Sequence, residues 1–384
     1  MIQVEPQALR NLFHLHGPRI AEQPLTDFSG LQRSTSTFCE VSPASIDEAC
    51  DIVRQAHRHG VPLRVRGQGH ALNGSSLPAA GELVLHTRRL CAVRCVQEGT
   101  VSAGAGIVLW TLRSLLERHG WTLPVVNDGY AGPSAGGFVA SGGFGSSSDR
   151  YGGFWDNVAE VTLLNGQGEL QRISRGAPLF RWLFGAMGQL GWVVEVRLDV
   201  VPTGSFPPAP YPGGLQLSSE QVLQYEATLP LGPPESERRR RLYWFTLFAP
   251  PAERKHALEL LARLEAQHPG TFHYLQRYLY PICRRGGMPP LIYPADTDFL
   301  ALGSWGFHEE ATLEALERLQ RFDEDFMALA AREGYRRYIQ SELPSAPAVY
   351  ERYFGAELYA EFRSRRLQQD PQALFNRGWV FQEG

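Results

Sequence analysis

Apolar positions in the first part of the chain recur at helical and strand spacing in turn. Residues 45–59 carry one apolar stripe, with Ser45 as a suitable N-cap and acidic residues in the first turn. Residues 62–66 follow at once as a short strand that ends in a glycine-rich turn. Further strands are predicted at residues 82–86 and 100–103, and a second amphipathic helix at residues 108–118. These two helix-and-strand units indicate an α/β lobe.

The pattern changes after residues 202–214, a proline-rich stretch that we interpret as a linker. Before it, residues 158–165 and 169–173 predict a hairpin around a Gly-Gln-Gly turn, and residues 192–201 predict another strand. After it, strands are predicted at residues 242–248 and 299–307, and helices at residues 252–267, 309–332 and 350–366. The second half therefore indicates a separate α+β lobe, and the turn and apolar end at residues 370–381 are suited to return to the first lobe.

Composition narrows the class of protein. With 384 residues, of which 43% are hydrophobic and 20% charged, the chain can bury a full-sized core in two or three lobes. The net charge of -3 and the lack of a long Lys/Arg block argue against a nucleic-acid partner. No apolar run reaches the length of a signal peptide or a membrane span, so we expect a cytoplasmic protein with no membrane partner. Five scattered cysteines without a CxxC pair predict neither a disulfide framework nor a metal site.

Two glycine-dense segments are where chemistry is expected. The first, Arg66-Gly67-Gln68-Gly69-His70-Ala71, follows a predicted strand, but Leu72 stands where a dinucleotide fingerprint has its third glycine. It also lacks the Gly-Lys-Ser/Thr end of a nucleoside-triphosphate loop. Its consecutive backbone amides can still form a cradle for a pyrophosphate. The second segment, residues 129–153, holds nine glycines, which indicates that its backbone approaches something closely.

These motifs resemble those of the vanillyl-alcohol-oxidase superfamily of flavoproteins, and most closely those of cytokinin dehydrogenases. The first glycine segment, continued to Ser75, is similar to the family's pyrophosphate loop. Residues 134–145 and 150–152 are similar to its second flavin-contact loop. Further similar stretches follow in family order at residues 27–31 (an opening strand), 157–169 (a hairpin), 188–194 (a strand beside the adenine), 353–355 and 370–378.

The resemblance implies a fold and a domain organisation. The expected fold is α+β, with a two-subdomain FAD-binding domain of the PCMH type at residues 1–205. An α+β substrate-binding domain with an antiparallel sheet is expected at residues 215–345. A C-terminal segment, residues 350–384, is expected to return to the FAD domain.

His70 and Asp128 carry the chemistry that the resemblance implies. In relatives, the histidine at the position of His70 is bonded covalently to the isoalloxazine of FAD, and an imidazole is suited to this because it has two distinct ring nitrogens. The alternative is a histidine that only satisfies a loop carbonyl. Asp128 stands where cytokinin dehydrogenases have an aspartate that takes a proton from the substrate as hydride leaves for the flavin. Because Asn-Asp-Gly is also a turn sequence, a purely structural Asp128 is the alternative.

The remaining cofactor contacts follow from position in the resemblance. They are Arg66, Gly67, Gln68, Gly69, Ala71, Ser75, Gly104, Ala105, Gly106, Asp128, Ser134, Gly137, Ser141, Gly145, Val193, Tyr338 and Asn376. Aromatic residues of the second lobe are candidates to line a substrate pocket, although aromatics at strand spacing are usually core. They are Tyr243, Phe245, Phe248, Tyr274, Trp305 and Phe307.

The predicted function is that of an FAD-dependent oxidase or dehydrogenase. It would take hydride from a C–H bond next to nitrogen or oxygen of a small organic molecule, either a cytokinin-like amine or a biosynthetic intermediate. The flavin would be reoxidised by O2 or by a quinone-like acceptor. The alternative is a protein that retains a flavin without redox turnover and serves as a binding or scaffolding module or catalyses a redox-neutral rearrangement.

Overall fold

The computed structural model describes residues 5–34, 37–97, 99–129, 132–204, 215–231, 241–272, 274–308, 312–341 and 347–378. Helices and largely antiparallel sheets give an α+β fold, which confirms the predicted class. Within those ranges, no helix has both the length and the apolar character that crossing a bilayer requires.

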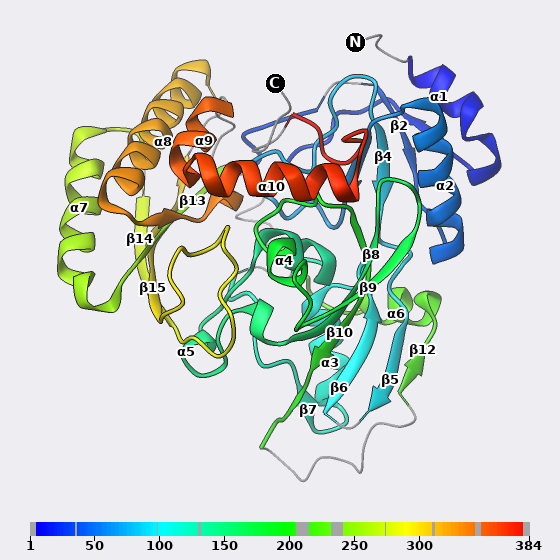
Figure 1. Ribbon diagram of the computed structural model, residues 1–384, viewed down its shortest axis with the longest axis horizontal. Coiled ribbons are helices and arrows are strands. Elements are labelled where there is room, and N and C mark those ends of the chain that lie inside the picture. Colours follow the sequence, from blue (N-terminus) through cyan, green and yellow to red (C-terminus); the bar gives the residue numbers. More distant parts are fainter. Residues whose placement is uncertain are drawn as a thin grey trace.

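The first sheet has the strand order β1 (Arg19–Ala21), β2 (Phe38–Val41), β4 (Leu83–His86) and β3 (Leu63–Arg66). Strands β2, β4 and β3 run parallel, because α2 (Ile46–His59) provides the crossover from β2 to β3. The predicted helix is confirmed: Ser45 accepts a hydrogen bond from the backbone of Glu48, and Gly60 ends the helix at φ 63°. Helices α1 (Pro6–Leu12) and α2 lie beside β2 and β4 (Figure 1).

The second sheet is entirely antiparallel. Its order is β12 (Gln216–Leu217), β5 (Val93–Gln97), β6 (Thr100–Gly104), β10 (Trp192–Asp199), β8 (Val158–Leu164) and β9 (Leu170–Ser174). The predicted hairpin of β8 and β9 is confirmed. The α/β interpretation of the second helix-and-strand unit is wrong, because its two predicted strands, β4 and β6, lie in different sheets, and β6 pairs antiparallel with β5, which was not predicted, and with β10.

Helix α3 (Leu109–Glu117) follows β6 as predicted, and β7 (Trp121–Thr122) then pairs with β11 (Val201–Pro202). The second glycine-dense segment contains two short helices, α4 (Ala135–Ser141) and α5 (Ser148–Tyr151), that the sequence pattern did not predict. Short 3-10 helices occur at His14–His16, Phe154–Asp156, Phe180–Leu183, Pro251–Glu253 and Ile339–Ser341.

A third sheet has the order β14 (Tyr274–Ile282), β15 (Phe299–His308), β13 (Arg241–Ala249) and β16 (Arg336–Arg337). Strand β14 was not predicted from the sequence. Helices α7 (Arg254–Gln267) and α8 (Leu313–Glu333) cover one face of this sheet, at the left of Figure 1. Helix α6 (Ser219–Glu226) packs instead beside α3. The other face of the third sheet is turned towards the two glycine-rich segments.

The C-terminal part consists of α9 (Pro347–Phe354) and α10 (Ala356–Gln369), which crosses the front of the molecule in Figure 1. The single helix predicted at residues 350–366 is wrong, because Gly355 adopts φ 86° and breaks it in two. After α10 the chain runs beside β3. The backbone of Leu63 donates to Leu374 at 2.8 Å, and the backbone of Asn376 donates to Leu63 at 2.8 Å.

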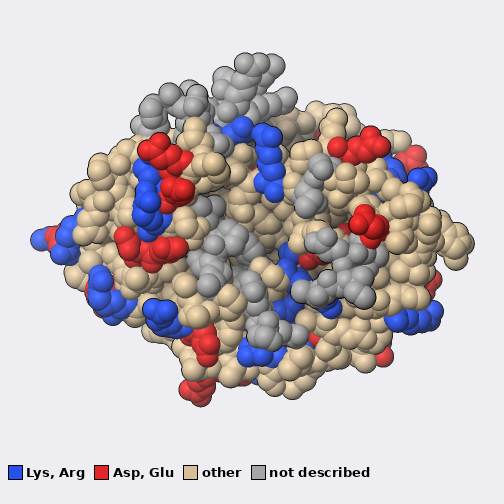
Figure 2. Space-filling model, turned by 90° about the horizontal axis from the view of Figure 1, so that it is seen from above, with Lys and Arg blue, Asp and Glu red and all other residues tan. Residues whose placement is uncertain are grey.

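On the face seen in Figure 2, the described acidic and basic side chains are interspersed, and neither sign forms a continuous patch there.

Candidate functional site

A cavity of about 570 Å³ lies between the glycine-rich segments and the third sheet. This volume is typical of sites for small ligands and cofactors. We call one side the glycine-rich wall; it consists of the lining residues within 65–76, 133–141 and 187–193, together with Thr87. The opposite side, the aromatic wall, consists of Leu242, Trp244, Tyr278, Tyr280, Trp305 and Tyr338.

Most of the residues named from the sequence line this cavity. They are Gly67, Gln68, Gly69, His70, Ala71, Ser75, Asp128, Ser134, Gly137, Ser141, Val193, Tyr338 and Asn376. Both glycine segments meet at Gly67, where an added Cβ would lie 2.4 Å from the hydroxyl of Ser134. Gly69 adopts φ 71°, which turns the loop towards His70. The sequence signal of two glycine-rich loops therefore corresponds to a single wall.

Five of the named residues do not line the cavity and lie behind it. They are Arg66, Gly104, Ala105, Gly106 and Gly145. The carbonyl of Ala105 accepts a hydrogen bond from Gly136 at 2.8 Å, and a Cβ on Gly106 would lie 1.9 Å from the Thr87 carbonyl. Arg66 donates to the hydroxyl of Ser76 at 3.0 Å and braces the loop from behind. These residues support the wall through close backbone packing.

His70 is held by stacking on Phe28, with the ring centroids 4.0 Å apart and 23° between the planes. Burial lowers the pKa of His70 to about 4, so the imidazole is neutral at physiological pH. Its Nε2 atom is buried and has no hydrogen-bond partner among the described residues. A neutral imidazole with an unengaged nitrogen on a cavity wall is a potential nucleophile or acceptor.

The sequence interpretation of residues 27–31 as an opening strand is wrong. Gly30, at φ 69°, donates its backbone N–H to Asp27 at 3.1 Å and closes a turn. The turn directs Phe28 to His70, and the backbone of Phe28 donates to Ala71 at 2.9 Å. Phe28 was missed as a site residue because a single aromatic residue before a glycine carries no local signal of stacking.

Four more buried polar atoms on the cavity lining lack a partner in the described part of the chain. They are Gln68 Nε2, Thr87 Oγ1, Trp192 Nε1 and Gln340 Oε1. An unsatisfied buried polar atom costs about 1–3 kcal/mol, so such atoms are rarely gathered without a reason. Together with His70 Nε2 they form a set of donors and acceptors that a polar ligand would satisfy. The lining thus fits a cofactor that carries several hydrogen-bonding groups.

Asp128 lies at the mouth of the cavity and is exposed, not enclosed by apolar residues. Ser146 donates both its backbone N–H and its hydroxyl to the Asp128 carboxylate, the hydroxyl at 2.6 Å. The hydroxyl of Tyr280, on the aromatic wall, also bonds to Asp128, and burial together with this carboxylate raises the pKa of Tyr280. Asp128 therefore joins two loops and the third sheet. Among the described residues, Asp128 is the one acidic side chain on the cavity lining.

The aromatic wall arises from strand alternation in β13. Leu242 and Trp244 face the cavity, whereas Tyr243 and Phe245 face α8, with ring centroids 6.1 and 5.0 Å from Phe322. Of the aromatic residues named from the sequence, Trp305 lines the cavity. The residues Tyr243, Phe245, Phe248 and Phe307 do not, and the side chain of Tyr274 lies outside the described part. Trp244, Tyr278 and Tyr280 were missed, because β13 is apolar on both faces and its pattern does not mark the cavity side.

The polar atoms around Tyr278 on the aromatic wall satisfy one another. The hydroxyl of Tyr278 bonds to Trp244 Nε1 and Thr246 Oγ1, and donates to the carbonyl of Phe245 at 3.1 Å. Gly303 lies opposite Tyr278 on β15, and an added Cβ there would lie 2.5 Å from this hydroxyl. Tyr278 can lie across β15 only because Gly303 has no side chain.

Part of the chain is similar to known proteins. Residues 39–174 match a protein family described as an FAD binding domain. Cytokinin dehydrogenase 7 of Oryza sativa subsp. japonica is 34% identical over 205 residues, which are 48% of this chain and 38% of that protein. An uncharacterised oxidoreductase in the fasciation locus of Rhodococcoides fascians is 32% identical over 162 residues, 41% of this chain and 36% of that protein.

A D-lactate dehydrogenase of Archaeoglobus fulgidus is 26% identical over 178 residues, which are 44% of this chain and 40% of that protein. The matched part thus spans 36% to 40% of the lengths of these three relatives.

Proposed function

From the premise that residues 39–174 are an FAD binding domain of the vanillyl-alcohol-oxidase superfamily, with similarity to cytokinin dehydrogenases, we propose that this protein is an FAD-dependent oxidoreductase. It takes hydride from a C–H bond next to nitrogen or oxygen of a small organic molecule. The observation that carries the proposal is that both glycine-rich segments and His70 meet at one 570 Å³ cavity, whose lining residues include five with a buried polar atom that lacks a partner among the described residues. A cofactor with many hydrogen-bonding groups satisfies such a wall, whereas an apolar ligand does not.

Different residues of the chain hold different parts of FAD. The backbone amides of the loop from Gly67 to Ala71 would hold the pyrophosphate, and the neutral imidazole of His70 would be the point of attachment for the flavin. Two features support attachment at His70: its ring is fixed against Phe28, and its Nε2 is buried without a partner among the described residues. When bound, FAD supplies the hydride acceptor.

Asp128 serves as the base that accepts a proton from the substrate. Its position at the cavity mouth and its carboxylate, the one acidic side chain among the described lining residues, support this role. Ser146 fixes the carboxylate from one side and Tyr280 from the other, so that it is oriented before substrate arrives.

The substrate is an amine or another molecule without a carboxylate. No Lys or Arg side chain occurs on the lining formed by the described residues, and the acidic side chain there is Asp128. A carboxylate bound beside Asp128 would be repelled and would lack a cation to pair with. Flat, uncharged or basic substrates against the aromatic wall are therefore favoured over a 2-hydroxy acid such as the D-lactate in the name of one relative.

One observation favours the alternative of a flavin-retaining protein without redox turnover. Both carboxylate oxygens of Asp128 already accept hydrogen bonds from Ser146, as expected of a structural residue. In that case the cofactor stays bound but no substrate reduces it.

Two measurements test the proposal. The purified protein is precipitated with acid, and flavin colour is expected to stay in the pellet of the wild type and to vanish from that of His70→Ala. The holoprotein is then mixed anaerobically with amines, alcohols and D-2-hydroxy acids, and the visible flavin absorbance is followed. Bleaching by an amine or alcohol supports the oxidoreductase. If no candidate bleaches a flavin that dithionite does reduce, the alternative replaces it.

A further inference from the structure

Strained backbone is concentrated at one place in the molecule. Among the described residues, the non-glycine residues with left-handed backbone are Met187 (φ 52°), Ala373 (φ 47°) and Asn376 (φ 48°). This conformation is costly for a residue with a Cβ and persists only where the surroundings hold it. Gly188, next to Met187, is also left-handed at φ 72°, and a Cβ there would lie 2.5 Å from Asn376 Nδ2. Two segments far apart in sequence therefore approach each other closely where both have left-handed backbone.

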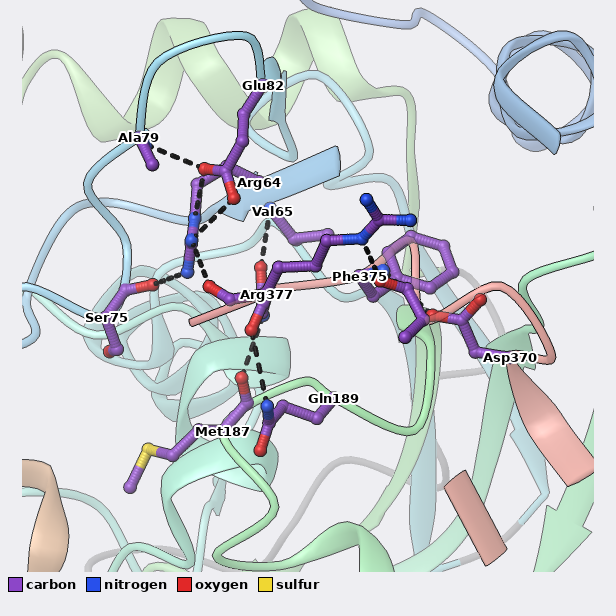
Figure 3. A network of polar contacts seen from close by, with 12 residues as sticks. Arg64, Val65, Ser75, Ala79, Glu82, Met187, Gln189, Asp370, Phe375 and Arg377 are labelled. Carbon is purple, nitrogen blue, oxygen red and sulfur yellow. Dashed lines mark hydrogen bonds and ion pairs between the residues drawn. The ribbon is translucent and has the colours of Figure 1, made fainter. Parts of the chain in front are cut away.

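Asn376 joins these two segments through its side chain. The backbone N–H of Val65 donates to Asn376 Oδ1 at 3.0 Å, and Asn376 Nδ2 donates to the carbonyl of Met187 at 2.8 Å. Gln189 Nε2 donates to the Asn376 carbonyl at 3.3 Å, and Figure 3 shows Val65, Met187 and Gln189 converging on this point. Val65 lies in β3, one residue before the strand ends at the first glycine loop, and Met187 leads into β10. Both residues line the cavity.

The segment is also anchored from the outer side by Arg64 (Figure 3). Arg64 donates to the carbonyl of Arg377 at 2.7 Å and to the carbonyl of Ser75 at 3.0 Å. A buried, bidentate ion pair with Glu82, at 2.7 and 2.8 Å, fixes its guanidinium. The same side chain thus ties residues 370–378 to the end of the glycine-rich loop.

We propose that residues 370–378, which we call the C-terminal latch, set the width of the cofactor cavity and that Asn376 is a positioning residue for FAD. Its side chain holds Val65 and Met187 at the separation that the bound cofactor needs. The inference rests on the proposed function. The polar side-chain atoms of Asn376 are directed to backbone groups of cavity-lining residues, so the latch acts on the cofactor through the wall.

The test uses Asn376→Ala and Asn376→Gly, each made in the His70→Ala background, where flavin retention is non-covalent and can be measured. Both variants lose the two side-chain hydrogen bonds, whereas glycine adopts the left-handed backbone without strain. We expect FAD to dissociate about tenfold faster, or more, from both. Gln372→Ala, an exposed change on the same segment, is the matched control and is expected to stay within about twofold of the parent.

Hydrogen exchange on flavin-free protein separates positioning from general destabilisation. Exchange is expected to rise at residue 65 and residues 187–193 in both Asn376 variants, with the third sheet unchanged. Faster FAD loss together with this local rise supports the latch. Unchanged FAD dissociation, or unchanged exchange at those residues, overturns it, as does wild-type retention in Asn376→Gly alone, which would assign the effect to backbone strain. If the wild type takes up no FAD at all, the proposed function fails as well.

Discussion

The two walls of the cavity differ in whether their buried polar atoms have hydrogen-bond partners. On the glycine-rich wall, His70, Gln68, Thr87 and Trp192 each present a buried polar atom that has no partner among the described residues. On the aromatic wall, the hydroxyl of Tyr278 is engaged by its neighbours.

A wall with unsatisfied atoms is complete only when a ligand supplies the missing partners, so it is built for one particular cofactor. An aromatic wall whose central hydroxyl already has hydrogen-bond partners needs none from a ligand. It selects substrates by their shape and by the absence of charge. Cofactor binding and substrate selection are therefore separate physical tasks in this cavity. Changes on the two walls should therefore have different signatures.

The largest expected effect is at Asp128, where the two walls meet. Asp128→Asn removes the proton acceptor, and the rate of flavin reduction by a good substrate is expected to fall about 100- to 10,000-fold, as measured by anaerobic stopped-flow absorbance. Flavin content should stay unchanged. Tyr280→Phe is the matched change on the aromatic wall and removes only an orienting hydrogen bond, so a loss of about tenfold or less is expected. Reduction of Asp128→Asn at the wild-type rate would remove Asp128 from the chemistry.

The next largest expected effect is on how the free energy of unfolding depends on pH, and it comes from His70 on the glycine-rich wall. Burial lowers the pKa of His70 from 6.5 to about 4, so the unfolded chain binds a proton in this interval that the folded, flavin-free protein does not. The free energy of unfolding should therefore fall as the pH drops from about 6.5 to about 4, by on the order of 2–3 kcal/mol. Urea titrations of protein from riboflavin-starved cells measure this. His70→Leu should lack this dependence, and an equal slope in both proteins would contradict it.

Asp156, which lies outside both walls, provides a control, because its effect on the free energy of unfolding changes with pH in the opposite direction. Burial raises its pKa to about 6, so its carboxyl is protonated in the folded protein at a pH where the unfolded chain is ionised. Its contribution to stability is present below about pH 4 and is lost as the pH rises to about 6. In the His70→Leu background, Asp156→Asn should make this loss of stability with rising pH smaller in the same urea titrations. A slope that survives both substitutions would come from other groups.

A smaller effect is expected on the aromatic wall. Tyr278→Phe removes a hydroxyl that is fully engaged, which leaves Trp244 Nε1 and Thr246 Oγ1 to find other partners. The free energy of unfolding is expected to fall by about 1–2 kcal/mol, while the ratio of flavin to protein stays at the wild-type value. Thermal unfolding and absorbance spectra give the two quantities. A loss of flavin would show that the two walls are not separate.

The smallest expected effect is a gain in stability, from a substitution on the glycine-rich wall. Thr87→Val replaces a buried hydroxyl that has no partner among the described residues with a methyl group of similar size. The flavin-free protein is expected to be more stable by about 1 kcal/mol, whereas FAD should bind less tightly. Calorimetric unfolding measures the stability of the flavin-free protein, and FAD titration in the His70→Ala background measures the affinity for FAD. A destabilised flavin-free protein would show that Thr87 is satisfied without the cofactor.

Local signals in the sequence were sufficient for several elements. The helix at residues 45–59 was predictable because its cap, apolar stripe and terminal glycine are all close in sequence. The hairpin at β8 and β9 was predictable for the same reason. Helix α4 was not, because its glycines disfavour a helix. Packing on β10 and the Ser134 cap, which accepts from Gly137 at 3.3 Å, overcome that propensity.

The sequence by itself determined the glycine-rich loop, the position of His70 within it and the α+β class, because turns, caps and strand alternation act over a few residues. Only the tertiary structure decided which face of β13 meets the cavity, that Phe28 stacks on His70, and that Asn376 bridges Val65 and Met187. These contacts join residues that are tens to hundreds of positions apart. Their energy depends on burial and on the satisfaction of polar atoms, which exist only once the chain has folded.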